Sequence, residues 1–163
     1  MKAFKKFAPV IAALLGVVAI VMLFLPAVVA GENSFNGLKA VFGWTKTTKS
    51  IVGTIETEML KFSFMNLLSY ILVAVGVVLS VLTFLGKGNK FFALIAAACF
   101  IVAAVFFFCT IPFTVVADGW NKLASAIGGN IKEGWKLGAG PIIAAICSIL
   151  AAGTAVAPAL LKK

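Results

Sequence analysis

The sequence predicts an all-α membrane protein, a bundle of four transmembrane helices, and two observations support this fold class. Of the 163 residues, 63% are apolar and 12% are charged, whereas soluble domains average about half and about a quarter. Four apolar runs without Asp, Glu, Lys or Arg reach the roughly 20 residues that cross a bilayer as a helix. Their unbroken apolarity favours helices over barrel strands, which alternate apolar and polar residues.

The expected spans cover residues 7–30, 65–85, 91–117 and 137–161, and residues 1–163 form a single integral membrane domain. A cleavable secretory signal is the alternative for the first run, because lysines precede it and a small residue, Ala30, ends it. The apolar stretch from Phe7 to Leu25 has 19 residues, which exceeds the usual signal core of about 7–15. We therefore expect a retained span.

The placement of the lysines predicts the orientation. The net charge is +9, and seven of the fourteen lysines lie at span ends in short segments without acids. These are Lys2, Lys5, Lys6, Lys87, Lys90, Lys162 and Lys163. The other seven share the loops 31–61 and 118–136 with all five acids. Because lysine-rich segments at span ends stay in the cytoplasm, we expect a plasma-membrane protein with both termini cytoplasmic. We expect these charges to contact the lipid bilayer, and we expect no nucleic acid as a partner.

The two halves share a pattern that suggests tandem duplication of a two-span unit. Leu25-Pro26 precedes the segment 36–43, and Ile111-Pro112 precedes 121–128, at an offset of 85 or 86 residues. Both segments read Asn-x-Leu-x-x, then a small apolar residue, a large one and Gly. The halves would be related by a pseudo-twofold axis along the membrane normal. Independent use of Pro and Gly as breakers is the alternative.

Each copy of this pattern predicts a short amphipathic helix in an outer loop. Apolar residues recur at i, i+3, i+4 and i+7 from Trp120, and Leu38, Val41 and Phe42 form a shorter stripe. Such helices can lie at the membrane interface. We expect Trp44, Trp120 and Trp135 to be interfacial anchors, because tryptophan is enriched at that level.

Two readings stay open for residues 45–57. Thr54 is a suitable helix N-cap, with Glu56 and Glu58 in the first turn. The stretch 45–53 alternatively forms a short strand pair. On a helix the two glutamates would point about 160° apart, which makes a poor carboxylate pair.

Small residues at four-residue intervals predict a helix-packing seam, because they let helix backbones approach closely. The seam consists of Gly140, Ala144, Ser148 and Ala152 on span four, and of Gly76 and Ser80 on span two. Since the spans carry no ionisable residue and the chain has no histidine, we expect neither an enzyme nor a cofactor or metal. Cys99, Cys109 and Cys147 lie in apolar runs, where packing is their expected role.

The segment from Leu25 to Gly43 resembles a segment of small uncharacterised four-span membrane proteins of Gram-positive bacteria. The use of lysine without arginine suits an AT-rich bacterial genome. The topology also resembles claudin-type tetraspans, with inner termini and a longer first outer loop, but this loop has no cysteine pair. The resemblance implies a bacterial source and no particular activity.

These observations predict a packing, accessory or self-assembling subunit of a membrane complex. We expect a homo-oligomer or a contact with another membrane protein, made through span four and the outer helices. A passive or permeabilising pore is the alternative, and its polar stripe would be Ser69, Ser80 and Thr83. A binding or catalytic site on the outer surface would require Glu56, Glu58 and Asp118 to converge.

Overall fold

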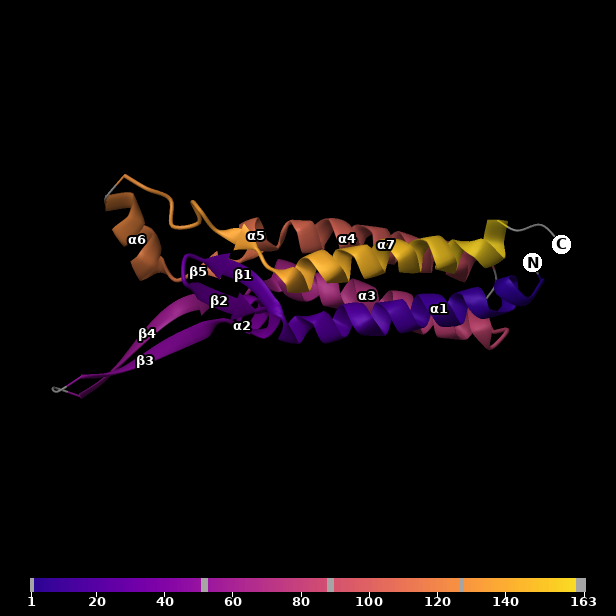
Figure 1. The fold of residues 1–163 in the computed structure, drawn as a ribbon, viewed down its shortest axis with the longest axis horizontal. Coiled ribbons are helices and arrows are strands. Elements are labelled where there is room, and N and C mark those ends of the chain that lie inside the picture. The colour runs from indigo at the N-terminus through magenta and orange to yellow at the C-terminus, as the bar shows by residue number, and fades with distance from the viewer. Residues whose placement is uncertain (1, 51–52, 88–89, 127, 161–163) are drawn as a thin grey trace.

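The computed structural model describes residues 2–50, 53–87, 90–126 and 128–160, and consists of a long helical bundle with a smaller cap at one end (Figure 1). The long helices are α1 (Lys2–Val21), α3 (Phe64–Phe84), α4 (Lys90–Phe108) and α7 (Ala139–Leu160). Each is long and apolar enough to cross a membrane, with the 3-10 helix η1 (Met22–Phe24) extending the first. The four expected helices are confirmed, and they indicate a multi-pass membrane protein.

The helices form a closed ring of neighbours in which α1 packs on α3, α3 on α4, α4 on α7 and α7 on α1. Successive helices run in opposite directions, and both ends of the chain lie at the end of the bundle opposite the cap (Figure 1). The cap therefore lies at the end of the bundle that carries the two loops expected to share one side of the membrane.

Two expected spans were too long at the cap end. The first helical segment stops at Phe24 rather than at residue 30, because Pro26 opens strand β1 (Pro26–Ala30) and proline cannot donate a helical hydrogen bond. Helix α4 ends at Phe108 rather than at residue 117, and Pro112 lies in the separate short helix α5 (Thr110–Phe113). The other two spans agree within two residues, although residue 161 lies outside the described residues.

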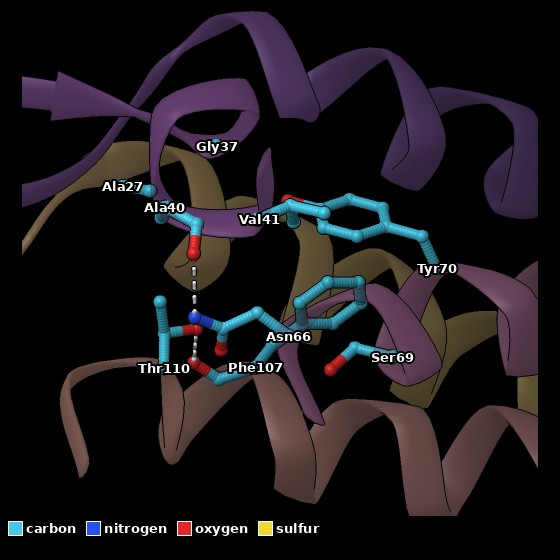
Figure 2. A pocket seen from close by; sticks show the side chains of 9 residues that line it. All are labelled: Ala27, Gly37, Ala40, Val41, Asn66, Ser69, Tyr70, Phe107 and Thr110. Carbon is cyan, nitrogen blue, oxygen red and sulfur yellow. Dashed lines mark hydrogen bonds between the residues drawn. The ribbon is translucent and has the colours of Figure 1, made fainter. Parts of the chain in front are cut away.

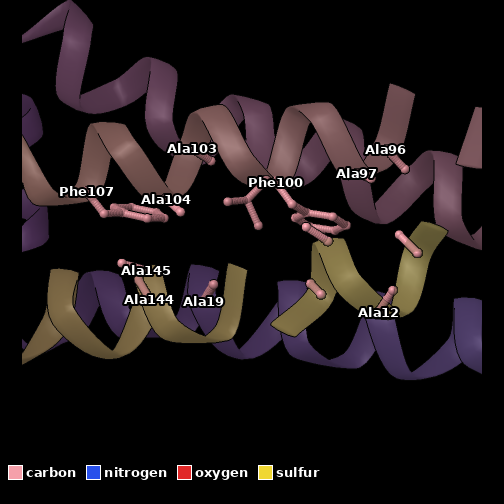
Figure 3. Close-up of a cluster of buried hydrophobic side chains, with 14 residues drawn as sticks. Ala12, Ala19, Ala96, Ala97, Phe100, Ala103, Ala104, Phe107, Ala144 and Ala145 are labelled. Carbon is pink, nitrogen blue, oxygen red and sulfur yellow. The ribbon is translucent and has the colours of Figure 1, made fainter. Parts of the chain in front are cut away.

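The bundle interior consists mostly of alanine, with two buried phenylalanine rings from α4 (Figure 3). The ring of Phe100 lies against two glycines, Gly16 of α1 and Gly76 of α3. A Cβ atom added to Gly76 would be 2.9 Å from two atoms of that ring. Phe107, also fully buried, contacts the ring of Tyr70 edge-on at a centroid distance of 5.0 Å. The interior is therefore filled by close apolar packing.

The cap contains two three-stranded antiparallel sheets, so the all-α expectation is correct for the bundle and wrong for the outer loops. One sheet has the order β2 (Asn33–Asn36), β1, β6 (Lys136–Leu137). The other has the order β3 (Trp44–Ser50), β4 (Gly53–Lys61), β5 (Val115–Val116). Four strands each bury one apolar side chain in a common cluster, which we call the cap core: Val28, Phe35, Leu60 and Val116. Sheets form here because these side chains gain burial only when the loops pair.

The two short helices expected in the loops are present as α2 (Gly37–Phe42) and α6 (Asp118–Ala126), and Ile127 at the end of the second stripe lies outside the described residues. Asn36 caps α2, its Oδ1 accepting from the Lys39 backbone at 3.0 Å. Gly37 is in close contact with η1, since a Cβ there would be 2.7 Å from the Leu23 carbonyl. Helix α2 is thus wedged between η1 and α3.

Strand pairing in the cap is reciprocal between the two halves of the chain. Strand β1, which leaves the first long helix, pairs with β6, which enters the fourth; Val28 lies opposite Leu137. Strand β5, which follows the third long helix, pairs with β4, which enters the second; Leu60 lies opposite Val116. This exchange is the pattern expected from a twofold relation between the halves.

Strands β3 and β4 form a long hairpin that extends beyond the rest of the cap (Figure 1). Thr45 lies opposite Glu58, Thr47 opposite Glu56 and Lys49 opposite Thr54, with a bulge next to Trp44. The expectation of strands is thus correct in kind, but its bounds of 45–53 were too short, because β3 pairs with a strand that continues to Lys61. The helix reading is wrong, because this threonine-rich stretch suits paired strands. We call the segments 45–50 and 53–58 the ribbon.

Candidate functional site

The helix-packing seam lies inside the bundle. Gly140, Ala144, Ser148 and Ala152 are all buried on α7, and Gly76 and Ser80 are buried on α3. A Cβ at Gly140 would be 2.9 Å from the Met22 carbonyl, so that end of the seam is in close contact with the start of η1. The chain's own helices occupy the seam, and a second copy cannot use it without opening the bundle.

A polar junction joins the cap to the bundle at the first turns of α3 (Figure 2). Asn66, only 3% exposed, donates from Nδ2 to the Ala40 carbonyl of α2 and to Thr114 Oγ1 after α5, both at 3.2 Å. Ser63, the N-cap of α3, accepts from the Asn66 backbone and donates to the Phe113 carbonyl at 2.6 Å. One turn of α3 therefore ties both loops of the cap to the bundle.

The polar junction borders a small cavity of about 10 Å³ lined by residues of α2, α3, α4 and the start of β1 and α5, at the lower limit for holding one water molecule. Asn66 Oδ1 is buried there and has no hydrogen-bond partner within the described protein. The cavity is far smaller than the roughly 300–1,000 Å³ of a small-molecule site. Its size suits a structural role.

The hydroxyl groups of the expected polar stripe are bonded to their own helix. Ser69 Oγ donates to the Met65 carbonyl, Ser80 Oγ to Gly76 at 2.8 Å and Thr83 Oγ1 to Leu79 at 2.9 Å. Serine and threonine in helices often bond the preceding turn in this way. Since Ser69 and Ser80 are also buried, they do not present a polar surface to a channel between bundles.

All three tryptophans pack against the cap core. The ring centroid of Phe35 lies 5.5 Å from that of Trp44 and 6.3 Å from that of Trp135, and Trp120 contacts the same cluster. Their role as interfacial anchors stays a prediction. Exposed phenylalanines lie near both ends of the bundle: Phe24, Phe42, Phe62, Phe64 and Phe108 towards the cap, and Phe7, Phe84 and Phe91 towards the other end. Aromatic rings at these levels suit the membrane interface.

The outer-loop acids do not converge on one site. Glu56 and Glu58 share one face of the ribbon, since alternate residues of a strand point the same way. Asp118 instead pairs with Lys61 at 2.6 Å, and this contact lowers the pKa of the Asp118 carboxyl and raises the pKa of Lys61. Within the described residues no group of three or more Cys, Asp or Glu side chains is placed to hold a metal ion.

Cys99, Cys109 and Cys147 are half-buried and free. Outside the spans, burial lowers the pKa of Lys132, whose Nζ donates to the Pro112 carbonyl at 3.0 Å. The sequence indicated only a structural role for Asn66, as one of the few polar residues within the spans. An amide side chain in the first turn of an apolar span is unusual, but its hydrogen-bond partners are far away in the sequence and could not be identified from it.

The fold and these sites define a four-helix membrane protein that carries a folded cap and a projecting β-ribbon at one end. The chain matches no protein-family model and no curated protein sequence. Its function must therefore be argued from the bundle, the cap and the ribbon.

Proposed function

We propose that the protein is a non-enzymatic subunit of a membrane assembly. The helical bundle is the anchor, and the cap and its ribbon are the surface that binds another membrane protein or a second copy. The observation that carries this proposal is the ribbon itself. Its described side chains from Thr45 to Lys49 are exposed, and so are those of Thr54, Glu56 and Glu58. A two-stranded ribbon without a covering layer is at best marginally stable alone, and a binding partner would stabilise it.

The bundle supports the role of an anchor. Its interior is closed by Phe100, Phe107 and the surrounding alanines, and the cavity beside Asn66 has room for at most one water molecule. A single bundle of this kind offers no path for a solute. The large apolar side chains on its outside, such as Ile149 and Leu150, are half exposed and suit contact with lipid.

The comparison of the two halves supports a specialised role for the ribbon. The reciprocal pairing of β1 with β6 and of β4 with β5 supports duplication of a two-span unit. The first half inserts the ribbon between α2 and α3, while the described residues between α6 and α7 contain only the short strand β6. A two-span unit can thus form its part of the bundle without a ribbon.

The orientation that we propose places the cap outside a bacterial plasma membrane and both termini in the cytoplasm. Support comes from the lysines, because Lys87 follows α3 and Lys90 begins α4, and these helix ends lie opposite the cap (Figure 1). Short lysine-rich links at span ends favour the cytoplasmic side.

A passive pore formed by a ring of bundles is the alternative function. It requires polar groups on the outside of a bundle, and the hydroxyls of Ser69, Ser80 and Thr83 donate to their own helix instead. A pore therefore has less support than an anchored subunit.

Shortening the ribbon tests the proposed function. Residues 46–57 are replaced by Asn-Gly, a favoured two-residue hairpin turn, which joins the directly paired Thr45 and Glu58. We expect the full-length chain, extracted in mild detergent, to carry partner chains or to exceed its own mass of 17.0 kDa. We expect the shortened chain to be a monomer.

Tryptophan emission is the control for folding, because Trp44, Trp120 and Trp135 all contact the cap core and their emission should not change. Partners retained by the shortened chain, or a full-length chain that is itself a monomer without partners, would contradict the proposal.

A further inference from the structure

The ribbon has two open edges. Strand β3 pairs only with β4 in the described chain, and β5 covers β4 only at Leu60 and Lys61. The Ala117 backbone extends this contact to the Met59 carbonyl. The edge of β4 from Gly53 to Glu58 is therefore open, as is the outer edge of β3. Open strand edges are templates for pairing with a further strand.

The two edges carry opposite charge. Strand β3 contributes Lys46 and Lys49 and no acid, whereas the open part of β4 contributes Glu56 and Glu58 and no lysine. The one ion pair between described side chains is Lys61 with Asp118, so these four charges are not paired within the chain. Like charges directly opposite each other on adjacent strands are destabilising, and opposite charges are stabilising.

We propose that the partner of the ribbon is a second copy of this chain, bound head to tail, with β3 of one copy adding to the open edge of β4 in the next. This inference rests on the proposed function and names the partner. Pairing β3 with β3 would place lysine beside lysine, and pairing β4 with β4 would place glutamate beside glutamate. Only the β3–β4 combination joins opposite charges.

The membrane determines how the ribbons of two copies are oriented relative to each other. Copies inserted with the same orientation are related by rotation about the membrane normal, so their ribbons point the same way. Since β3 and β4 are antiparallel in each copy, β3 of one copy meets β4 of the next in antiparallel orientation as well. With Lys49 of one copy opposite Glu56 of its neighbour, Thr47 is opposite Glu58. Such a contact is heterologous and forms a ring or an open chain of copies.

Charge reversal with mixing tests this interface. Lys49→Glu and Glu56→Lys are made in separate chains, and assembly is measured by native mass spectrometry and by light scattering against concentration. We expect each variant alone to need a roughly tenfold higher concentration for assembly. In an equal mixture the two variants can alternate. At one contact the glutamate introduced at position 49 then meets the lysine introduced at position 56, and at the next contact the unaltered Lys49 meets the unaltered Glu56. The mixture should therefore assemble like the wild type.

The mixture separates contacts between chains from those within one chain. Lys49 and Glu56 are also diagonal neighbours in the same ribbon, and mixing leaves that repulsion in place. Rescue by mixing also requires folded chains, so it excludes misfolding as the cause of the loss. Lys122→Glu on α6 is the control, because it makes the same change of charge at an exposed position outside the ribbon, and it should assemble normally.

Three results would overturn the inference: single variants that assemble normally, a mixture that fails to assemble, and a wild-type complex that holds one copy with other polypeptides. The third would leave the proposed function intact and refute only the identity of the partner. A wild-type chain that is monomeric and without partners would refute both.

Discussion

The contact between Gly76 and Phe100 at the centre of the bundle can be tested with Gly76→Ala. The added Cβ would be 2.9 Å from Cε1 and Cζ of the Phe100 ring, closer than an ordinary contact of 3.4–4 Å. The ring cannot retreat freely, because it is fully buried and also lies against Gly16. Overpacking of this kind costs about 1–3 kcal/mol, and the helix propensity of alanine offsets up to about 1 kcal/mol. We expect a net loss of up to about 2 kcal/mol.

The assay is unfolding in detergent by added SDS, followed with a thiol-reactive dye. Cys99 and Cys147 lie half-buried on α4 and α7 and become reactive when the bundle opens. Gly153→Ala is the matched control on α7, because a Cβ there meets nothing within 4 Å. It should leave the stability unchanged or raise it by up to about 1 kcal/mol.

A second substitution checks the physical cause. Phe100→Leu removes the far end of the ring, so it should lower the cost of Gly76→Ala when the two are combined. Equal stability of Gly76→Ala and Gly153→Ala, or strict additivity with Phe100→Leu, would refute the packing described for the bundle centre.

Four further predictions concern the polar groups and the cap. Ser148→Ala should be neutral or stabilising in SDS unfolding, because its buried hydroxyl has no hydrogen-bond partner in the described protein and leaving such a group unpaired costs about 1–3 kcal/mol. Asn66→Leu should lower the free energy of unfolding by about 1–3 kcal/mol in the same assay, because it leaves two buried acceptors without their donor. Phe35→Ala removes a ring that is 5% exposed; we expect it to destabilise the cap by about 3–5 kcal/mol and to shift tryptophan emission to the red, while far-ultraviolet circular dichroism of the bundle is retained. The ion pair of Lys61 with Asp118 should stabilise the cap only between two pH limits, read from tryptophan emission against Asp118→Asn: its contribution is complete above the ordinary carboxyl pKa of 3.8 and is lost as the pH falls through the lowered pKa of Asp118, and it is complete below 10.5 and is lost as the pH rises through the raised pKa of Lys61.

The bundle could be predicted from the sequence because each span is a local property of about 20 apolar residues. The sheets could not, because their pairing is distant in sequence. Val28 meets Leu137, and Leu60 meets Val116. Strands β5 and β6 have only two residues each, too few for any alternation to be recognised.

The candidate sites also divide into features that a local sequence pattern can predict and contacts between distant residues that it cannot. Small residues at four-residue spacing predicted a helix-packing seam, but a pattern on one helix does not show whether the partner is internal or external. Ala144 and Ser148 are fully buried in the chain's own bundle. Threonine suits both N-caps and strands, so the sequence of the ribbon fits either a helix or a strand pair. The pairing of Thr47 with Glu56 shows that it forms strands. The partners of Asn66 lie 26 and 48 residues away, beyond the range of local patterns.

Disulfide cross-linking in intact membranes tests most directly whether the ribbon joins two copies. A chain with Thr47→Cys is co-expressed with a chain with Glu58→Cys, positions that lie opposite each other only between copies in the proposed pairing. We predict a cross-linked band at twice 17.0 kDa, absent with either variant alone and with Thr47→Cys beside Lys122→Cys. The absence of this band, or a band of equal strength with the Lys122→Cys control, would contradict assembly through the ribbon.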